Sequence, residues 1–111
     1  FKYIVTYGTS MGGFGSIKYG KLFKATHCIS FAPQYSISPE EVKSWDRRFL
    51  SHYNPSLNNN MEIIEADLAG TSYILYDPMY KEDAVHANYL NKIICICTCF
   101  SDFTYSYYSR K

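Results

Sequence analysis

Short apolar runs alternate with helix-compatible stretches along the 111-residue chain. The runs are rich in β-branched and aromatic residues and are too short to form helices, so they predict strands. They lie at residues 3–7, 25–32, 71–76 and 93–100. Amphipathic stretches at residues 11–24 and 81–92 predict helices. Strands that alternate with helices are typical of an α/β fold with a mostly parallel sheet.

Residues 36–70 depart from this alternation and predict an excursion between the second and third strands. Ser38 is a suitable N-cap, and Pro39 suits the first position of a helix. Glu41 follows the cap by three residues and completes a capping-box pattern. A helix should therefore begin at Pro39 and run to about Leu50.

Aromatic side chains in and before the excursion have two open interpretations. They are Tyr35, Trp45, Phe49 and Tyr53. They would form the walls of a ligand pocket if the excursion covers an active site, or an ordinary aromatic core that holds the excursion to the sheet. The charged residues at 46–48 are interpreted as a solvated helix face or as local ion pairs, rather than as a substrate clamp.

A serine flanked by glycines follows the first strand, in the pattern Gly8-x-Ser10-x-Gly12. This spacing is typical of a nucleophile elbow, in which a strand reverses sharply into a helix and holds the serine in a strained backbone conformation. A Cβ at either glycine would collide with the neighbouring backbone. The backbone N–H of Met11, at the start of the helix, would donate to an oxyanion. A glycine-rich turn without chemistry is the alternative interpretation.

Residues 3–36 resemble the α/β-hydrolase fold family in the elbow and in the Ala-Pro-Gln sequence at 32–34. The similarity is closest to bacterial hydrolase-like proteins that carry a Gly-x-Ser-Met-Gly-Gly elbow, and the Tyr-Asp-Pro sequence at 76–78 extends it over roughly residues 3–92. The resemblance implies a three-layer α/β/α fold, of which this chain would be the C-terminal half. Residues 36–70 would then be a cap-like excursion, and residues 101–111 an atypical tail.

The same resemblance implies the chemistry of a serine hydrolase. Ser10 would attack a carboxylic ester or a related acyl bond, and the amide of Met11 would stabilise the oxyanion. Asp77 follows a later strand, where the acid of the family orients a histidine; the alternative is a turn-forming aspartate before a proline. The resemblance implies no metal and no organic cofactor. The expected binding partner is a small-molecule acyl substrate.

The histidine of the family would follow the last strand, but residues 101–111 contain none. His86 is the only histidine after Asp77 and is therefore the candidate base, with a partly exposed histidine on a helix surface as the alternative. His52 is a weaker candidate. If no imidazole reaches Ser10, the chain is a catalytically incomplete fragment or a non-catalytic interaction module. Both functions stay open.

The chain begins at Phe1, almost inside the first strand, whereas the family places several strands before the nucleophile strand. We therefore expect a fragment of a longer protein, or a truncated or frame-shifted gene product. Without the early strands, residues 3–7 would form a bare sheet edge. A bare edge favours self-association through its unpaired backbone groups.

The net charge of +1 offers no electrostatic basis for binding nucleic acid or an anionic membrane. The sequence has no long uncharged apolar run of the kind that predicts a membrane span. We expect a cytoplasmic protein. Cys95, Cys97 and Cys99 share one face of their predicted strand but are spread along it, which does not suit a metal site. Together with Cys28 they are interpreted as buried thiols of a reducing compartment.

Overall fold

The sheet contains parallel strands in the order in which they occur along the chain. The computed structural model describes residues 2–94, 96–101 and 104–109, with side chains for residues 2–94. The strands are β1 (Val5–Thr9), β2 (His27–Phe31), β3 (Thr71–Tyr76), β4 (Ile96–Ser101) and β5 (Thr104–Ser109), in the spatial order β1-β2-β3-β4-β5. The first four pair in parallel, and β5 pairs antiparallel to β4. The predicted α/β class and mostly parallel sheet are confirmed.

Helices occupy the connections between the strands. They are α1 (Met11–Lys18), α2 (Pro39–Val42), α3 (Pro55–Asn58) and α4 (Lys81–Asn91), with short 3-10 helices at Leu50–His52 and Glu65–Asp67. α2 begins at Pro39 as predicted but does not reach Leu50. The side chain of Asp46 accepts a hydrogen bond from the backbone N–H of Arg48, which competes with helical hydrogen bonding. Within the described residues, no helix has the length and apolar character that a bilayer span requires.

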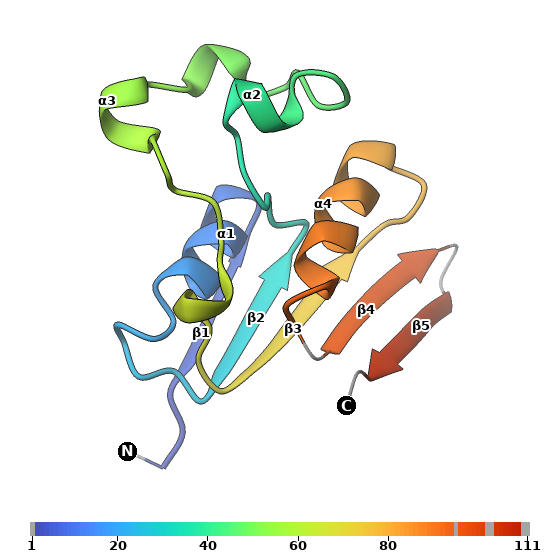
Figure 1. Cartoon of the computed structure of the whole chain (residues 1–111). Coiled ribbons are helices and arrows are strands. Elements are labelled where there is room, and N and C mark those ends of the chain that lie inside the picture. Colours follow the sequence, from blue (N-terminus) through green and yellow to red (C-terminus); the bar gives the residue numbers. More distant parts are fainter. Residues whose placement is uncertain (1, 95, 102–103, 110–111) are drawn as a thin grey trace.

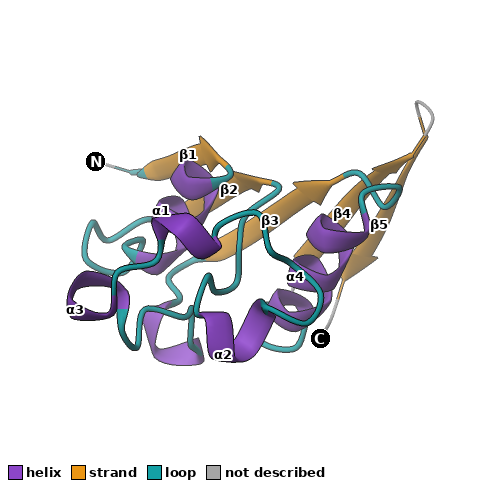
Figure 2. Ribbon diagram, turned by 90° about the horizontal axis from the view of Figure 1, so that it is seen from above, coloured by secondary structure: helices purple, strands orange, loops and turns teal. Residues whose placement is uncertain are grey.

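The described helices lie on one face of the sheet (Figure 2). The strand order explains this arrangement. Parallel strands are joined by right-handed crossovers in nearly all proteins, and here successive strands are added in the same direction, so every crossover falls on the same side. The predicted three-layer arrangement, with helices on both faces, is not confirmed, because no described helix covers the second face.

The two faces of the sheet differ strongly in burial. Under the helices, the side chains of Cys28, Ser30 and Ile74 are 0% exposed. On the open face, Val5 and Tyr7 are 50% and 78% exposed. β1 is also an edge strand, which pairs with β2 alone among the described strands. The open face and the open edge therefore meet at β1.

The hydrophobic core lies between the sheet and the helices. Ile17 of α1, Ile63 of the excursion and Leu90 of α4 are each at most 1% exposed and belong to one cluster. The excursion thus contributes to the core. Figure 1 shows α2 and α3 beyond the carboxyl ends of β1 and β2, at the end of the molecule opposite the N-terminus.

β1 and α1 cross at a very short distance where the chain reverses. A Cβ on Gly8 would lie 2.3 Å from the carbonyl carbon of Gly12. No side chain fits in that space, so the reversal requires glycine at position 8. The collision predicted for Gly12 is wrong, because a Cβ there would meet no atom within 4 Å. Gly13 is the glycine of α1 that lies close to the sheet. A Cβ added to Gly13 would lie 3.2 Å from the backbone oxygen of Phe31.

Replacing Gly8 with alanine should lower the free energy of unfolding by about 3 kcal/mol, because the new methyl group overlaps backbone atoms that cannot move independently. Gly12→Ala is the matched control. Its methyl group meets nothing, so the variant should be neutral or more stable by up to about 1 kcal/mol. Urea denaturation of both variants measures the difference, and equal stabilities would contradict the crossing geometry.

Candidate functional site

Ser10 lies at the reversal between β1 and α1 in a strained backbone conformation. Its φ is 54° and its ψ is −114°, a region that non-glycine residues rarely adopt. Its N–H donates to the carbonyl of Phe31 in β2 at 2.8 Å, and its carbonyl accepts from the N–H of Phe14 in α1 at 2.9 Å. The predicted strand-turn-helix arrangement is therefore present. The catalytic role of Ser10 stays a prediction.

The hydroxyl of Ser10 donates a hydrogen bond to the side-chain oxygen of Gln34 at 3.2 Å. The amide nitrogen of Gln34 donates to the carbonyl of Ala32, also at 3.2 Å, which fixes the orientation of the amide. Gln34 is 4% exposed. A neutral amide oxygen holds the hydroxyl in place but is too weak a base to remove its proton. In the sequence, Gln34 stands out only as part of the Ala-Pro-Gln motif, although its position just after β2 puts it at the same sheet edge as Ser10.

His86, the predicted base, is 0% exposed and makes hydrogen bonds through both ring nitrogens. Its Nδ1 accepts from the backbone N–H of Tyr35 at 2.9 Å, so the ring proton lies on Nε2, which donates to Asp46 at 2.9 Å. The alternative expectation of a partly exposed helix histidine is wrong. Since neither nitrogen is left to accept a proton from Ser10, His86 does not serve as the base in this arrangement.

The carboxylate of Asp46 is buried within a network of charged partners. Arg48 donates two side-chain hydrogen bonds to it, at 3.0 and 2.9 Å, and also pairs with Asp83 of α4 at 3.0 Å. Burial raises the pKa of Asp46, but the hydrogen bonds from Arg48 and His86 outweigh burial and hold the pKa at about 2. The expected local ion pair is present, and Asp46 is buried rather than solvated. The network joins the excursion to α4.

The burial of His86 lowers the pKa of its imidazole, although the hydrogen bond to Asp46 acts in the opposite direction. Trp45 packs edge-on against the ring, with centroids 4.6 Å apart. The apolar neighbour and the accepted hydrogen bond from Tyr35 both favour the neutral ring. His86 therefore acts as a neutral bridge between the Asp46 carboxylate and the loop after β2.

Asp77 lies just beyond the carboxyl end of β3, at the sheet edge where the sequence predicted it. Its carboxylate accepts a hydrogen bond from the backbone N–H of Met79 at 2.9 Å. This is the hydrogen bond of a turn-forming aspartate, which was the alternative interpretation. None of the hydrogen bonds found in the described part of the chain joins Ser10, Asp77 and His86 to one another. The role of Asp77 as the acid stays a prediction.

A cavity of about 290 Å³ lies beside the elbow. Its walls come from α1, from the loop after β2 and from the excursion, and they include Met11, Phe14, Gln34, Phe49, His52 and Met61. Because Gln34 also accepts the hydrogen bond of the Ser10 hydroxyl, the cavity adjoins Ser10. The structure thus brings the elbow and the excursion together around a space that could hold a ligand.

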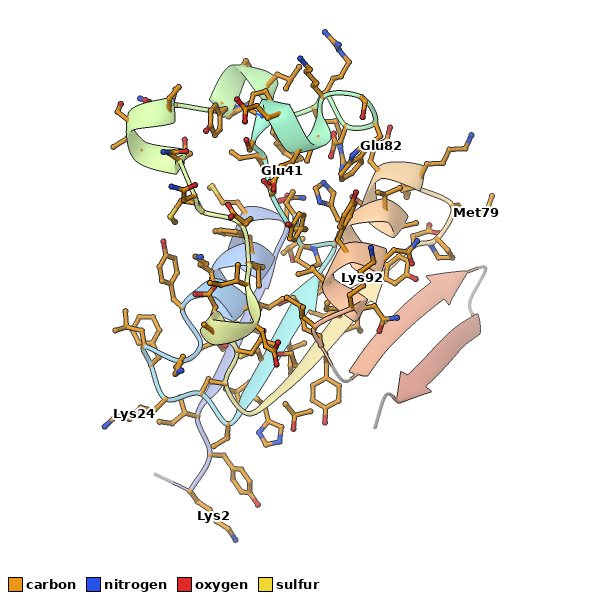
Figure 3. All side chains as sticks on the ribbon, in the orientation of Figure 1. Lys2, Lys24, Glu41, Met79, Glu82 and Lys92 are labelled. Carbon is orange, nitrogen blue, oxygen red and sulfur yellow. The ribbon has the colours of Figure 1, made fainter. Side chains whose placement is uncertain are left out.

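Aromatic side chains hold the excursion against α4. Trp45 stacks on Tyr89 with ring centroids 5.9 Å apart, and Tyr35 stacks on the same ring at 5.0 Å. Figure 3 shows side chains filling the space between α2 and α4. Tyr35 and Trp45 therefore belong to an aromatic core, whereas Phe49 lines the cavity. The two interpretations of the aromatic residues apply to different members of the group.

No group of histidine, cysteine and acidic side chains within the described residues is arranged to hold a metal ion. Cys28 is a buried free thiol, so the predicted burial is confirmed for this cysteine, and the reducing compartment stays a prediction. Cys95 and the side chains of Cys97 and Cys99 lie outside the described residues.

Comparisons of the chain with models of known protein families, with curated proteins and with solved structures find no match. Membership of the α/β-hydrolase family therefore stays a prediction. It depends on the elbow and on the two shorter motifs after β2 and β3.

The free energy of unfolding should fall as the pH decreases below 6.5, the ordinary pKa of histidine. The folded-state pKa of His86 is lowered, so the unfolded chain binds the proton more readily, and stability is lost as the pH falls from 6.5 towards the folded-state pKa. The slope should be at most about 1.4 kcal/mol per pH unit. Urea denaturation at a series of pH values between about 8 and 4.5 measures it.

His86→Gln should remove this slope, because glutamine keeps a donor for Asp46 but does not titrate. His52→Gln, the same change at an exposed position, is the control and should keep the slope. Asp46 contributes little above about pH 5, since the stability from its lowered pKa is lost mainly as the pH falls through its ordinary value of 3.8. A slope that persists in the His86 variant would assign the pH dependence to another group.

Proposed function

We propose that this chain carries the nucleophile of a serine hydrolase that cleaves a carboxylic ester or a related acyl bond. The observation that supports it best is the backbone of Ser10, which is held at a φ of 54° beside a cavity. Strain of this kind persists only where the surrounding structure enforces it, and it concentrates at active sites. The resemblance of the elbow to that of the α/β-hydrolases supports the same function.

In the proposed reaction, the Oγ of Ser10 attacks the carbonyl carbon of the ester and forms an acyl-enzyme, while the alcohol leaves with a proton. The carbonyl oxygen becomes an oxyanion in the tetrahedral intermediate and accepts a hydrogen bond from the N–H of Met11. Met11 is the first residue of α1, where backbone N–H groups have no partner within the helix. Water then cleaves the acyl-enzyme and restores Ser10.

The proposed reaction needs a base that takes the proton of Ser10, and three imidazoles are candidates. His86 would have to give up its hydrogen bond to Tyr35 or to Asp46. His52 borders the cavity and would have to approach Ser10. The third route is an imidazole from another polypeptide segment, which would replace Gln34 as the acceptor of the hydroxyl hydrogen bond.

A second candidate function follows from the same contacts. A non-catalytic binding module would use the cavity without cleaving its ligand. The observation that favours it is that Gln34, rather than an imidazole, accepts the hydrogen bond of Ser10, while His86 and Asp77 have other partners.

A cytoplasmic location and a small acyl ester as the binding partner complete the proposal. The buried free thiol of Cys28 supports the location, because such thiols are typical of a reducing compartment. Self-association through the β1 edge also stays a prediction, supported by the pairing of β1 with β2 alone among the described strands.

Labelling with a fluorophosphonate probe tests the proposed function. The wild-type protein should be labelled, because the probe reacts with a serine whose hydroxyl is activated by a base. Ser10→Ala should lose at least about 90% of the label, since the serine is the reacting group. Ser44→Ala, which removes an exposed serine after α2, should label as strongly as the wild type.

Labelling that persists in Ser10→Ala would show that another side chain reacts. A folded wild-type protein that is not labelled at all would overturn the hydrolase and favour the binding module. Thermal unfolding of each variant establishes that it is folded before labelling is compared.

A further inference from the structure

The cavity beside Ser10 is bordered by apolar side chains of α1 and the excursion, together with polar side chains such as Ser36, Ser38 and Asn58. Met11 and Phe14 come from α1, and Phe49 and Met61 come from the excursion. Methionine is unbranched and polarisable, so it adapts to an apolar ligand. Met11 is 81% exposed although it adjoins the elbow. An apolar ligand in the cavity would therefore cover surface that now faces water, which favours binding.

The volume of the cavity indicates how much of a ligand it can cover. A cavity of about 150 Å³ holds benzene, with six non-hydrogen atoms, so a cavity of about 290 Å³ holds roughly ten such atoms. An unbranched acyl group of about eight carbon atoms, with its carbonyl oxygen, fits within this limit. A long fatty acyl chain would extend out of the cavity.

The charges at the cavity disfavour an anionic acyl group. Glu62 contributes to the lining, and no lysine or arginine does so among the described residues. A carboxylate on the ligand would lose hydration without gaining a lysine or arginine partner from the lining, and Glu62 would repel it.

We propose that the cavity binds the acyl group of the substrate, as an uncharged apolar chain of about eight carbon atoms. This inference rests on the proposed serine hydrolase function and names its substrate class. Met11 of α1 and Phe49 and Met61 of the excursion would contact the bound chain, since all three line the cavity.

Binding to Ser10→Ala tests the inference separately from cleavage, because this variant has no nucleophile. Calorimetry with butanamide and octanamide should show at least about tenfold tighter binding of octanamide, since each buried methylene contributes roughly a factor of four. The monoamide of octanedioic acid has the same chain with a terminal carboxylate. It should bind at least about tenfold more weakly than octanamide, because of Glu62.

Two further variants in the Ser10→Ala background locate the binding site. Met61→Trp places a larger side chain in the cavity wall and should weaken octanamide binding at least about tenfold. Leu57→Ala changes a residue of the same excursion that is 73% exposed and does not line the cavity, so binding should be unchanged. Circular dichroism establishes that both variants are folded.

The outcomes separate this inference from the proposed function. Equal affinity for butanamide and octanamide, or undiminished binding to a folded Met61→Trp variant, would overturn the acyl site. Fluorophosphonate labelling of Ser10 without octanamide binding would overturn the acyl site and leave the hydrolase. Chain-length-dependent binding without labelling would overturn the hydrolase, and with it the acyl-donor role of the bound chain.

Discussion

The crossing of β1 and α1 at Gly8 is the constraint on which the candidate site depends. The backbones touch there, since a Cβ on Gly8 would lie 2.3 Å from Gly12. The chain completes this reversal with Ser10 at a positive φ, and the backbone of Ser10 is held by β2 on one side and by α1 on the other. A single close contact thus brings together the strained serine, the N-terminus of α1 and the carboxyl edge of the sheet.

The buried pair of Asp46 and His86 is the second determinant of the site, although it does not reach Ser10. A carboxylate that binds an imidazole is two thirds of a catalytic triad. Here the other ring nitrogen accepts the backbone N–H of Tyr35, so the imidazole joins the excursion, α4 and the loop after β2. With Arg48 and Asp83 completing the hydrogen bonds, this polar network keeps the excursion against α4 and so keeps one wall of the cavity in place.

The order of the strands decides which surfaces the protein exposes. Successive strands are added to the sheet in the same direction, and their crossover connections have the same handedness. The second face of the sheet therefore stays open, and Val5 and Tyr7 are exposed on it. Parallel sheets are usually covered on both faces. The cavity is lined by α1, the loop after β2 and the excursion. The open apolar face is therefore a separate feature of the surface.

The sequence by itself determined strands β1 to β4, the reversal at Ser10 and the start of α2 at Pro39, because each depends on residues that are close in the chain; it did not predict β5 in residues 104–109. Only the tertiary structure decided the partners of the candidate site residues. Gln34 is 24 residues from Ser10, and Asp46 is 40 residues from His86. Hydrogen bonds across such separations depend on which elements pack together, and local hydrophobic periodicity shows which face of an element is buried but not its partner. For the same reason, the sequence indicated a serine nucleophile but not the acceptor of its hydrogen bond.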